Sequence, residues 1–269
     1  MERKKRAEQK KFWTGCVLLV LVVLLAVFIP IVSPYSYSGQ DAKAANLGVS
    51  MAHWFGTDKF GRDIFTRVWY GARLSLSIGL GSALLSGITG TLLGAAAGYF
   101  GGIIDQLVMR TADVVDAIPS LLYVILITLV LGSNAGSILL GICICGWIET
   151  ARIVRGEVLR LKTSEYCQAA RLLGASSGRI IRHHILPNAA GPLIVNLTYF
   201  IPKAIFTEAF LSFVGVGIAA PEASLGTLIS EGRLQMRLYP WQMLFPVLIL
   251  CLLLVALNLI GTGLEEGQT

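Results

Sequence analysis

The chain has 269 residues, of which 55% are hydrophobic and only 14% are charged. Soluble domains carry roughly 25% charged residues, and the mean hydropathy of this chain is +0.70. This composition excludes an ordinary water-soluble domain. The formal net charge is +6, but the basic residues gather at the ends of apolar runs, so they indicate the charge asymmetry of a membrane protein and no nucleic-acid partner.

The first apolar run covers residues 12–32 and follows a cluster of lysines and arginines. At 1.5 Å per residue, about 20 residues cross roughly 30 Å of hydrocarbon. The run ends near Pro30 without a small-residue cleavage site. We therefore expect a retained transmembrane helix that enters from the cytoplasm, and no cleaved signal peptide.

Five more runs are apolar enough to span a bilayer. They cover residues 74–99, 111–131, 136–154, 191–217 and 241–260. A polar stretch, 33–70, separates the first two spans, and Pro119 should kink the third. The loop after the fourth span is basic, which places it and both termini in the cytoplasm.

The second span carries small residues four positions apart. They are Ser82, Ser86, Gly90, Gly94 and Gly98. On a helix this spacing makes one smooth face. Because helices in lipid gain little from hydrophobic burial against each other, close backbone contact along such a face can replace it. We interpret the ladder as a helix-packing face.

Residues 161–188 read LKTSEYCQAARLLGASSGRIIRHHILPN and predict two short helices separated at Gly174. Thr163 or Ser164 can cap the first helix, and Gly174 is a natural stop. Ser176 or Ser177 can cap the second, which Pro187 should end. The expected result is a basic elbow that projects into the cytoplasm and docks a partner; the alternative is a solvated loop without one.

At these residues the sequence resembles the Glu-Ala-Ala loop of permease subunits of ABC importers. The matching residues are Glu165, Ala169, Ala170, Gly174, Leu186 and Pro187. Three residues separate Glu165 from Ala169, and His184 stands where isoleucine is usual. Both departures resemble the peptide-and-nickel branch of the family. Residues 53–76, 98–110, 205–217 and 239–246 fit the same branch, and most resemble the C permease of oligopeptide and dipeptide systems.

The resemblance implies an all-α integral membrane protein with six transmembrane helices and the type I importer fold. It implies an N-terminal part (1–72), a permease domain (73–262) with its coupling loop at 155–190, and a cytoplasmic tail (263–269). The implied partners are a second homologous permease, two ABC ATPases, an extracytoplasmic solute-binding protein and the lipid bilayer. The motif G-x-x-x-x-G-K-[ST] does not occur in these residues, so we expect a non-catalytic subunit that binds no cofactor, with ATP and Mg on the partner ATPases.

Charged residues within spans are costly and mark candidate pathway positions. Glu208 can line a cavity and meet a peptide amine, or contact the partner permease instead. Lys203 is the second candidate, and it can also pair with a neighbour. Asp113 and Asp116 lie nearer the cytoplasmic end and suit an interface. Residues 55–73 can contact the binding protein from outside, or serve only as a structural turn.

Metal and disulfide chemistry are not expected. His183 and His184 are adjacent and point about 100° apart on a helix, which argues against a shared metal site. The five cysteines are odd in number and lack zinc spacing.

Two other classes of protein are alternatives. A secondary transporter would show inverted repeats, and an intramembrane enzyme would show a nucleophile and base; neither pattern occurs in these residues. Within the importer class, nickel or another small solute is the alternative cargo to oligopeptides or dipeptides.

Overall fold

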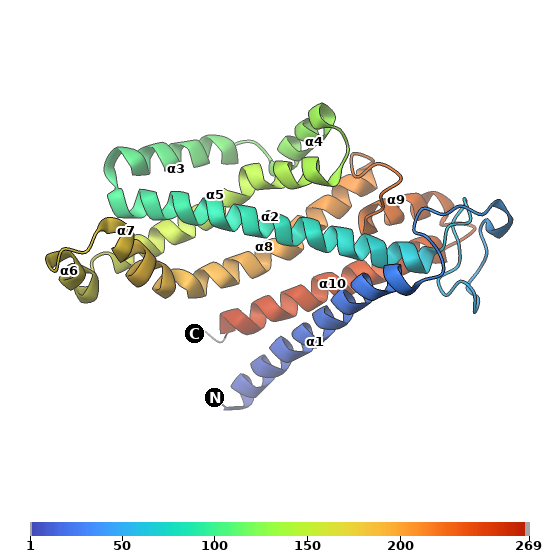
Figure 1. The fold of residues 1–269 in the computed structure, drawn as a ribbon, viewed down its shortest axis with the longest axis horizontal. Coiled ribbons are helices and arrows are strands. Elements are labelled where there is room, and N and C mark those ends of the chain that lie inside the picture. The colour runs from blue at the N-terminus through green and yellow to red at the C-terminus, as the bar shows by residue number, and fades with distance from the viewer. Residues whose placement is uncertain (1, 267–269) are drawn as a thin grey trace.

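A computed structural model describes residues 2–266 of the chain, and every regular element within them is helical. The body is elongated (Figure 1). The α-helices are α1 (Glu2–Val32), α2 (Ile64–Phe100), α3 (Gly102–Asp116), α4 (Ser120–Leu131), α5 (Ala135–Leu161), α6 (Glu165–Leu172), α7 (Ser177–Ile180), α8 (Leu186–Val214), α9 (Leu225–Gln235) and α10 (Trp241–Glu266). A π-helical turn, Ile181–Ile185, joins α7 to α8.

The two ends of the body differ (Figure 1). We call the end that carries α6 and α7 the elbow end. The opposite end, where α1 stops, α2 starts and α9 lies, is the cap end; it includes the loop 33–63. Helices α1 and α10 run side by side between the two ends.

Five stretches are long and apolar enough to cross a membrane, namely Gln9–Val32, Ile64–Phe100, Ala135–Leu161, Ser177–Val214 and Trp241–Glu266. Helices α3 and α4 pass the same test as a pair that is bent by 80°. The predicted all-helical fold is confirmed, and the number of candidate spans is five, or the predicted six when the bent pair is counted as one broken span.

The third span differs from the expected kinked helix, because the chain stops being helical between Asp116 and Ser120. Pro119 cannot donate a backbone hydrogen bond, and it disfavours helical geometry at the residue before it. A full break with an 80° turn is the result. Each half is too short to cross about 30 Å of hydrocarbon alone.

Several helices extend beyond the expected spans by a turn or more. Helix α2 begins at Ile64, ten residues before the expected span at 74, because Asp63 caps it by accepting a hydrogen bond from the Thr66 amide at 2.8 Å. Helix α5 continues to Leu161, seven residues beyond the expected end at 154. Helix α10 continues to Glu266, so part of the predicted tail 263–269 is helical and residues 267–269 lie outside the described residues.

Two further differences concern prolines and loops. Pro187 does not end the second elbow helix; it occupies the first turn of α8, where its missing N–H is tolerated, and the helical course continues through it. The loop expected after the fifth span contains a helix of its own, α9, which begins at a capping box formed by Ser224 and Thr227.

The small-residue ladder of α2 lies against α5. A Cβ atom placed on Gly90 would lie 2.6 Å from the carbonyl oxygen of Trp147, and one on Gly98 would lie 2.9 Å from that of Arg155. A Cβ on Gly94 would overlap the backbone of Ala151. Ser82 and Ser86 are buried on the same face. Only residues with little or no side chain permit two helix backbones to approach this closely.

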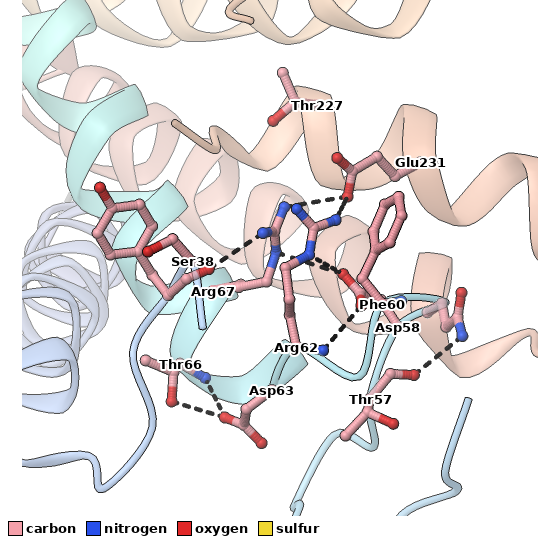
Figure 2. A network of polar contacts seen from close by, with 12 residues as sticks. Ser38, Thr57, Asp58, Phe60, Arg62, Asp63, Thr66, Arg67, Thr227 and Glu231 are labelled. Atoms are coloured by element: carbon pink, nitrogen blue, oxygen red, sulfur yellow. Dashed lines mark hydrogen bonds and ion pairs between the residues drawn. The ribbon is translucent and has the colours of Figure 1, made fainter. Parts of the chain in front are cut away.

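The cap end is held by buried charges, and Figure 2 shows their arrangement. Arg62 donates to Asp58 within the loop and, through Nη2, to Glu231 Oε2 of α9 at 2.8 Å. Arg67 of α2 donates to the same Glu231 oxygen at 3.1 Å and to the carbonyl oxygen of Tyr37 at 3.1 Å. The Arg67 residue is only 1% exposed. Loop, α2 and α9 are therefore joined by charge-assisted hydrogen bonds.

A glycine fixes the turn beside this network. Gly61 has φ +71°, and a Cβ on it would overlap the backbone of Asp41. The structural turn that was one interpretation of residues 55–73 is present at Gly61, and it leads through the Asp63 cap into α2.

Replacing Gly94 with alanine should destabilise the chain, although alanine favours an exposed helix by about 1 kcal/mol over glycine. The new Cβ would lie 2.9 Å from the Ala151 Cα and closer still to its oxygen, and overpacking of this kind costs about 1–3 kcal/mol. The measurement is the thermal unfolding midpoint in detergent. Gly156→Ala is the control, since its Cβ meets nothing within 4 Å; equal midpoints for both variants would contradict the packing role.

Replacing Arg67 with methionine should cost about 1–3 kcal/mol of folding free energy, because the Tyr37 carbonyl loses its donor and Glu231 keeps only Arg62 as a cationic partner. The unfolding midpoint in detergent should fall accordingly. Arg73→Met is the matched control on the same helix, since that side chain is exposed and stacks over Tyr70. If the two variants unfold together, the buried network does not hold the cap end.

Candidate functional site

The elbow begins with α6, an eight-residue helix whose end is set by Gly174. Gly174 has φ +83°, a conformation that costs other residues about 1–2 kcal/mol. Its amide donates to the Arg171 carbonyl at 3.0 Å, and the next amide, of Ala175, donates to the Ala170 carbonyl at 3.0 Å. This pair of bonds is a Schellman motif, which ends α6 and turns the chain.

The second arm of the elbow starts at Ser176, whose hydroxyl accepts a hydrogen bond from the Arg179 amide. At the start of α6 the structure differs from the expectation: Ser164 sits at the cap position, but its hydroxyl donates to the Leu161 carbonyl at 2.6 Å. The helix start is therefore fixed by backbone geometry and not by a side-chain cap.

A small hydrophobic core joins the elbow to the end of α5. Cys167 of α6, Ile180 of α7 and Ile185 of the π turn are buried together with Val158 and Leu161 of α5. Ala170 and Leu186 pack at the edge of this cluster. A displacement of the elbow must therefore move the ends of α5 and α8 with it.

The outer surface of the elbow carries the remaining matched residues. Glu165, Ala169 and Pro187 are exposed or half-buried, and His184 is half-buried with its ring 6.2 Å from that of Tyr166. The most exposed apolar side chains here are Leu172 at 89% and Leu173 at 88%. The sequence pattern places these leucines in or next to the short helix without indicating a role for them. Their exposure could have been expected, because two adjacent leucines precede the helix-ending glycine and a single helix face cannot bury both.

A cavity of 440 Å³ lies between α4, α5 and α8, near the break that follows α3. Its charged lining residues are Asp116, Glu149, Arg152 and Lys203. Lys203 Nζ lies 3.8 Å from Glu149 Oε2, and the Lys203 side chain is 70% exposed. Arg152 donates to Asp116 at 2.8 Å and to Asp113 at 3.1 Å. Exposed charges within spans indicate a water-accessible surface, because lipid would exclude them.

Glu208 does not line this cavity. Its side chain is completely buried and accepts hydrogen bonds from the Ser75 hydroxyl at 2.8 Å and the Ser212 hydroxyl at 2.9 Å. The expectation that it meets a peptide amine is therefore not met in this structure. Within the chain, Glu208 joins α8 to α2 and lies close to the start of α9.

Comparison with known proteins places the chain in a family. Residues 90–267 match the family described as binding-protein-dependent transport system inner membrane component. Residues 7–48 match the N-terminal transmembrane domain of oligopeptide transport permease C.

Two curated relatives from Bacillus subtilis (strain 168) match over nearly the whole chain. The oligopeptide transport system permease protein OppC is 45% identical, over 94% of this chain and 83% of its own length. The dipeptide transport system permease protein DppC is 42% identical, over 98% of this chain and 83% of its own length.

The fold is also found among solved structures. An inward-facing structure of the MetNI methionine ABC transporter matches with a TM-score of 0.58 at 18% identity, covering 76% of this chain and 96% of that chain. This likeness concerns the fold alone. Taken with the family matches, the chain is a multi-pass cell-membrane protein that belongs to the binding-protein-dependent transport system inner membrane components, the permease subunits of ABC importers.

Proposed function

We propose that this chain forms half of the path by which oligopeptides or dipeptides cross the cell membrane, driven by ATPases on separate polypeptides. The two relatives that are 45% and 42% identical carry the names of oligopeptide and dipeptide permeases. The second half of the path would come from a homologous permease, and an extracytoplasmic binding protein would deliver the cargo.

One observation carries the mechanism: the helical course from the elbow to the cavity has no break. The stretch Ser177–Val214 is long and apolar enough to be one span. Its first turns belong to the elbow core, and Lys203, Ala204 and Thr207 further along line the cavity. A push on the elbow would therefore be transmitted along this continuous helix, through the π turn and past Pro192 and Pro202, to the cavity wall, and would switch access between the two sides of the membrane.

The elbow has the surface that such a push requires. Leu172 and Leu173 project from it, with Glu165 and Ala169 on the same short helix. We assign this surface to the ATPase, with the leucines entering an apolar groove and Glu165 making a charged contact that sets the orientation. ATP and Mg would remain on the ATPases, and this chain would be non-catalytic.

The charge pattern supports a cytoplasmic elbow. In this orientation both termini are cytoplasmic, and the loop 33–63 and α9 face the outside, where the binding protein would dock. We propose the same division of the chain as the resemblance implies: an N-terminal part (1–72), a permease domain (73–262) and a cytoplasmic tail (263–269).

The direct test is to purify the complex through this chain, identify the co-purified subunits, and measure ATP-dependent uptake in vesicles. The proposal expects ABC ATPases, a second permease and uptake of labelled peptides. Uptake of radioactive nickel instead of peptide would overturn the cargo, and uptake that persists without any ATPase would indicate a secondary transporter.

Replacing Gly174 with valine should abolish transport while the chain remains in the membrane. Valine is β-branched and strongly resists a φ of +83°, so the Schellman turn and the elbow angle should be lost. Peptide uptake and co-purification of the ATPase are the two measurements.

Two further variants separate folding from docking at the elbow. Gly178→Ala is the control, since Gly178 is helical and its Cβ meets nothing within 4 Å. The double variant Leu172→Ser, Leu173→Ser keeps the turn and should lose the ATPase. Normal transport by both the Gly174 variant and the double variant would refute the docking role.

The cavity charges should discriminate among peptides. A unit charge about 4 Å away is worth about 1 kcal/mol in water, or about fivefold in rate or affinity. Lys203→Met should therefore slow uptake of acidic peptides more than basic ones, and Glu149→Gln should do the opposite. Lys59→Met, at the cap end, is the control. A uniform effect of the cavity variants on all peptides would remove these residues from the path.

A further inference from the structure

The loop 33–63, which the proposed function places on the outer side, contains an apolar stretch to which that function gives no specific contact. Between Ala44 and Thr57 the sequence contains no Asp, Glu, Lys or Arg. Within it, residues 47–54, which we call the apolar loop, expose Leu47, Val49, Met51 and Trp54. Met51 is 97% exposed and Trp54 is 59% exposed. Exposed apolar side chains gathered in one patch mark surfaces that contact a protein or a membrane.

The apolar loop is held open by its own hydrogen bonds. The Leu47 amide donates to the Thr57 hydroxyl at 2.8 Å, and the Thr57 amide donates to the Leu47 carbonyl at 3.0 Å. At the tip, the Ser50 amide donates to the His53 carbonyl at 2.9 Å. The His53 ring is anchored to Asp63 at 2.9 Å. These bonds satisfy the amides of Leu47, Ser50 and Thr57 and fix the hairpin from which the apolar side chains project. Backbone groups of the loop without such a bond need water or headgroups as partners, which places the backbone at the headgroup level and lets only side chains go deeper.

The position of the apolar loop connects it with the lipid-facing surface of α1. A hollow of 370 Å³ is lined by Ile29 and Val32 from the last turns of α1 and by Met51 and Trp54 from the loop. Val32 is itself 75% exposed and ends a predicted span. The Trp54 ring lies 4.9 Å from that of Phe65, the second residue of α2. The same hollow is also lined by Ser33, Tyr35 and Asp63, so the loop lies beside the end of the first candidate span where polar residues begin.

We propose that the apolar loop inserts into the adjacent lipid leaflet, at the boundary between headgroups and acyl chains. Val49 and Met51 enter the acyl region, and Trp54 lies at the interface, where its amphipathic ring is favoured. The rigid hairpin adds a second membrane anchor to α1 at the cap end. This inference does not depend on the cargo or on the ATPase.

Depth-dependent quenching tests the insertion. The purified transporter complex is prepared with the five native cysteines replaced and one fluorophore attached through Met51→Cys, and is reconstituted in phosphatidylcholine–phosphatidylglycerol vesicles that contain a phosphatidylcholine with a nitroxide near its headgroup. The label should be quenched several-fold more strongly than one attached through Lys59→Cys, the exposed charged position after the loop. Both leaflets carry the quencher, so the result is independent of orientation.

Equal, weak quenching at both positions would overturn the proposal. If the Met51 label then became buried only when the second permease or the binding protein was present, a protein and not lipid would be the occupant. A second measurement needs no cysteine changes: brominated phosphatidylcholine should quench a smaller part of the tryptophan emission in Trp54→Tyr than in the parent. Trp69→Tyr, at a buried position, is the control for this measurement. If brominated lipid quenches the same fraction of the emission in Trp54→Tyr as in the parent, insertion is refuted.

Discussion

The close approach of α2 and α5 is the contact on which the rest of the structure depends. In lipid the hydrophobic effect between helices is lost, so dispersion between backbones that nearly touch must hold the pair together. The contact extends from Ser82 to Gly98, nearly half of α2, whose 37 residues reach about 55 Å. At the cap end, the first turns of α2 contribute Arg67 to the network of buried charges. At the elbow end, the last turns of α5 pack in the elbow core.

The features that could be predicted from the sequence are local ones. The ladder, the Gly174 turn and the Ser176 cap each depend on residues within one or two helical turns, where spacing and backbone preference act directly. Apolar runs long enough to span a membrane are equally local. For this reason the amino-acid pattern alone predicts the six spans and the two arms of the elbow, although the ends of several helices differ from the prediction by several residues.

The features that could not be predicted depend on distant partners. Glu208 has the pattern of a cavity residue, but Ser75, 133 positions away, donates to its carboxylate. Arg67 and Glu231 are 164 positions apart, and nothing in either neighbourhood indicates their pairing. The proline positions are ambiguous for another reason: Pro119 breaks a helix and Pro187 begins one, and the difference depends on where the preceding turn ends.

The leucine pair on the elbow has a consequence for copies of the chain that lack a partner. If an ATPase covers Leu172 and Leu173 as proposed, an unassembled copy exposes two adjacent apolar side chains on an otherwise basic surface. Exposed apolar surface of this kind favours unspecific association with other proteins.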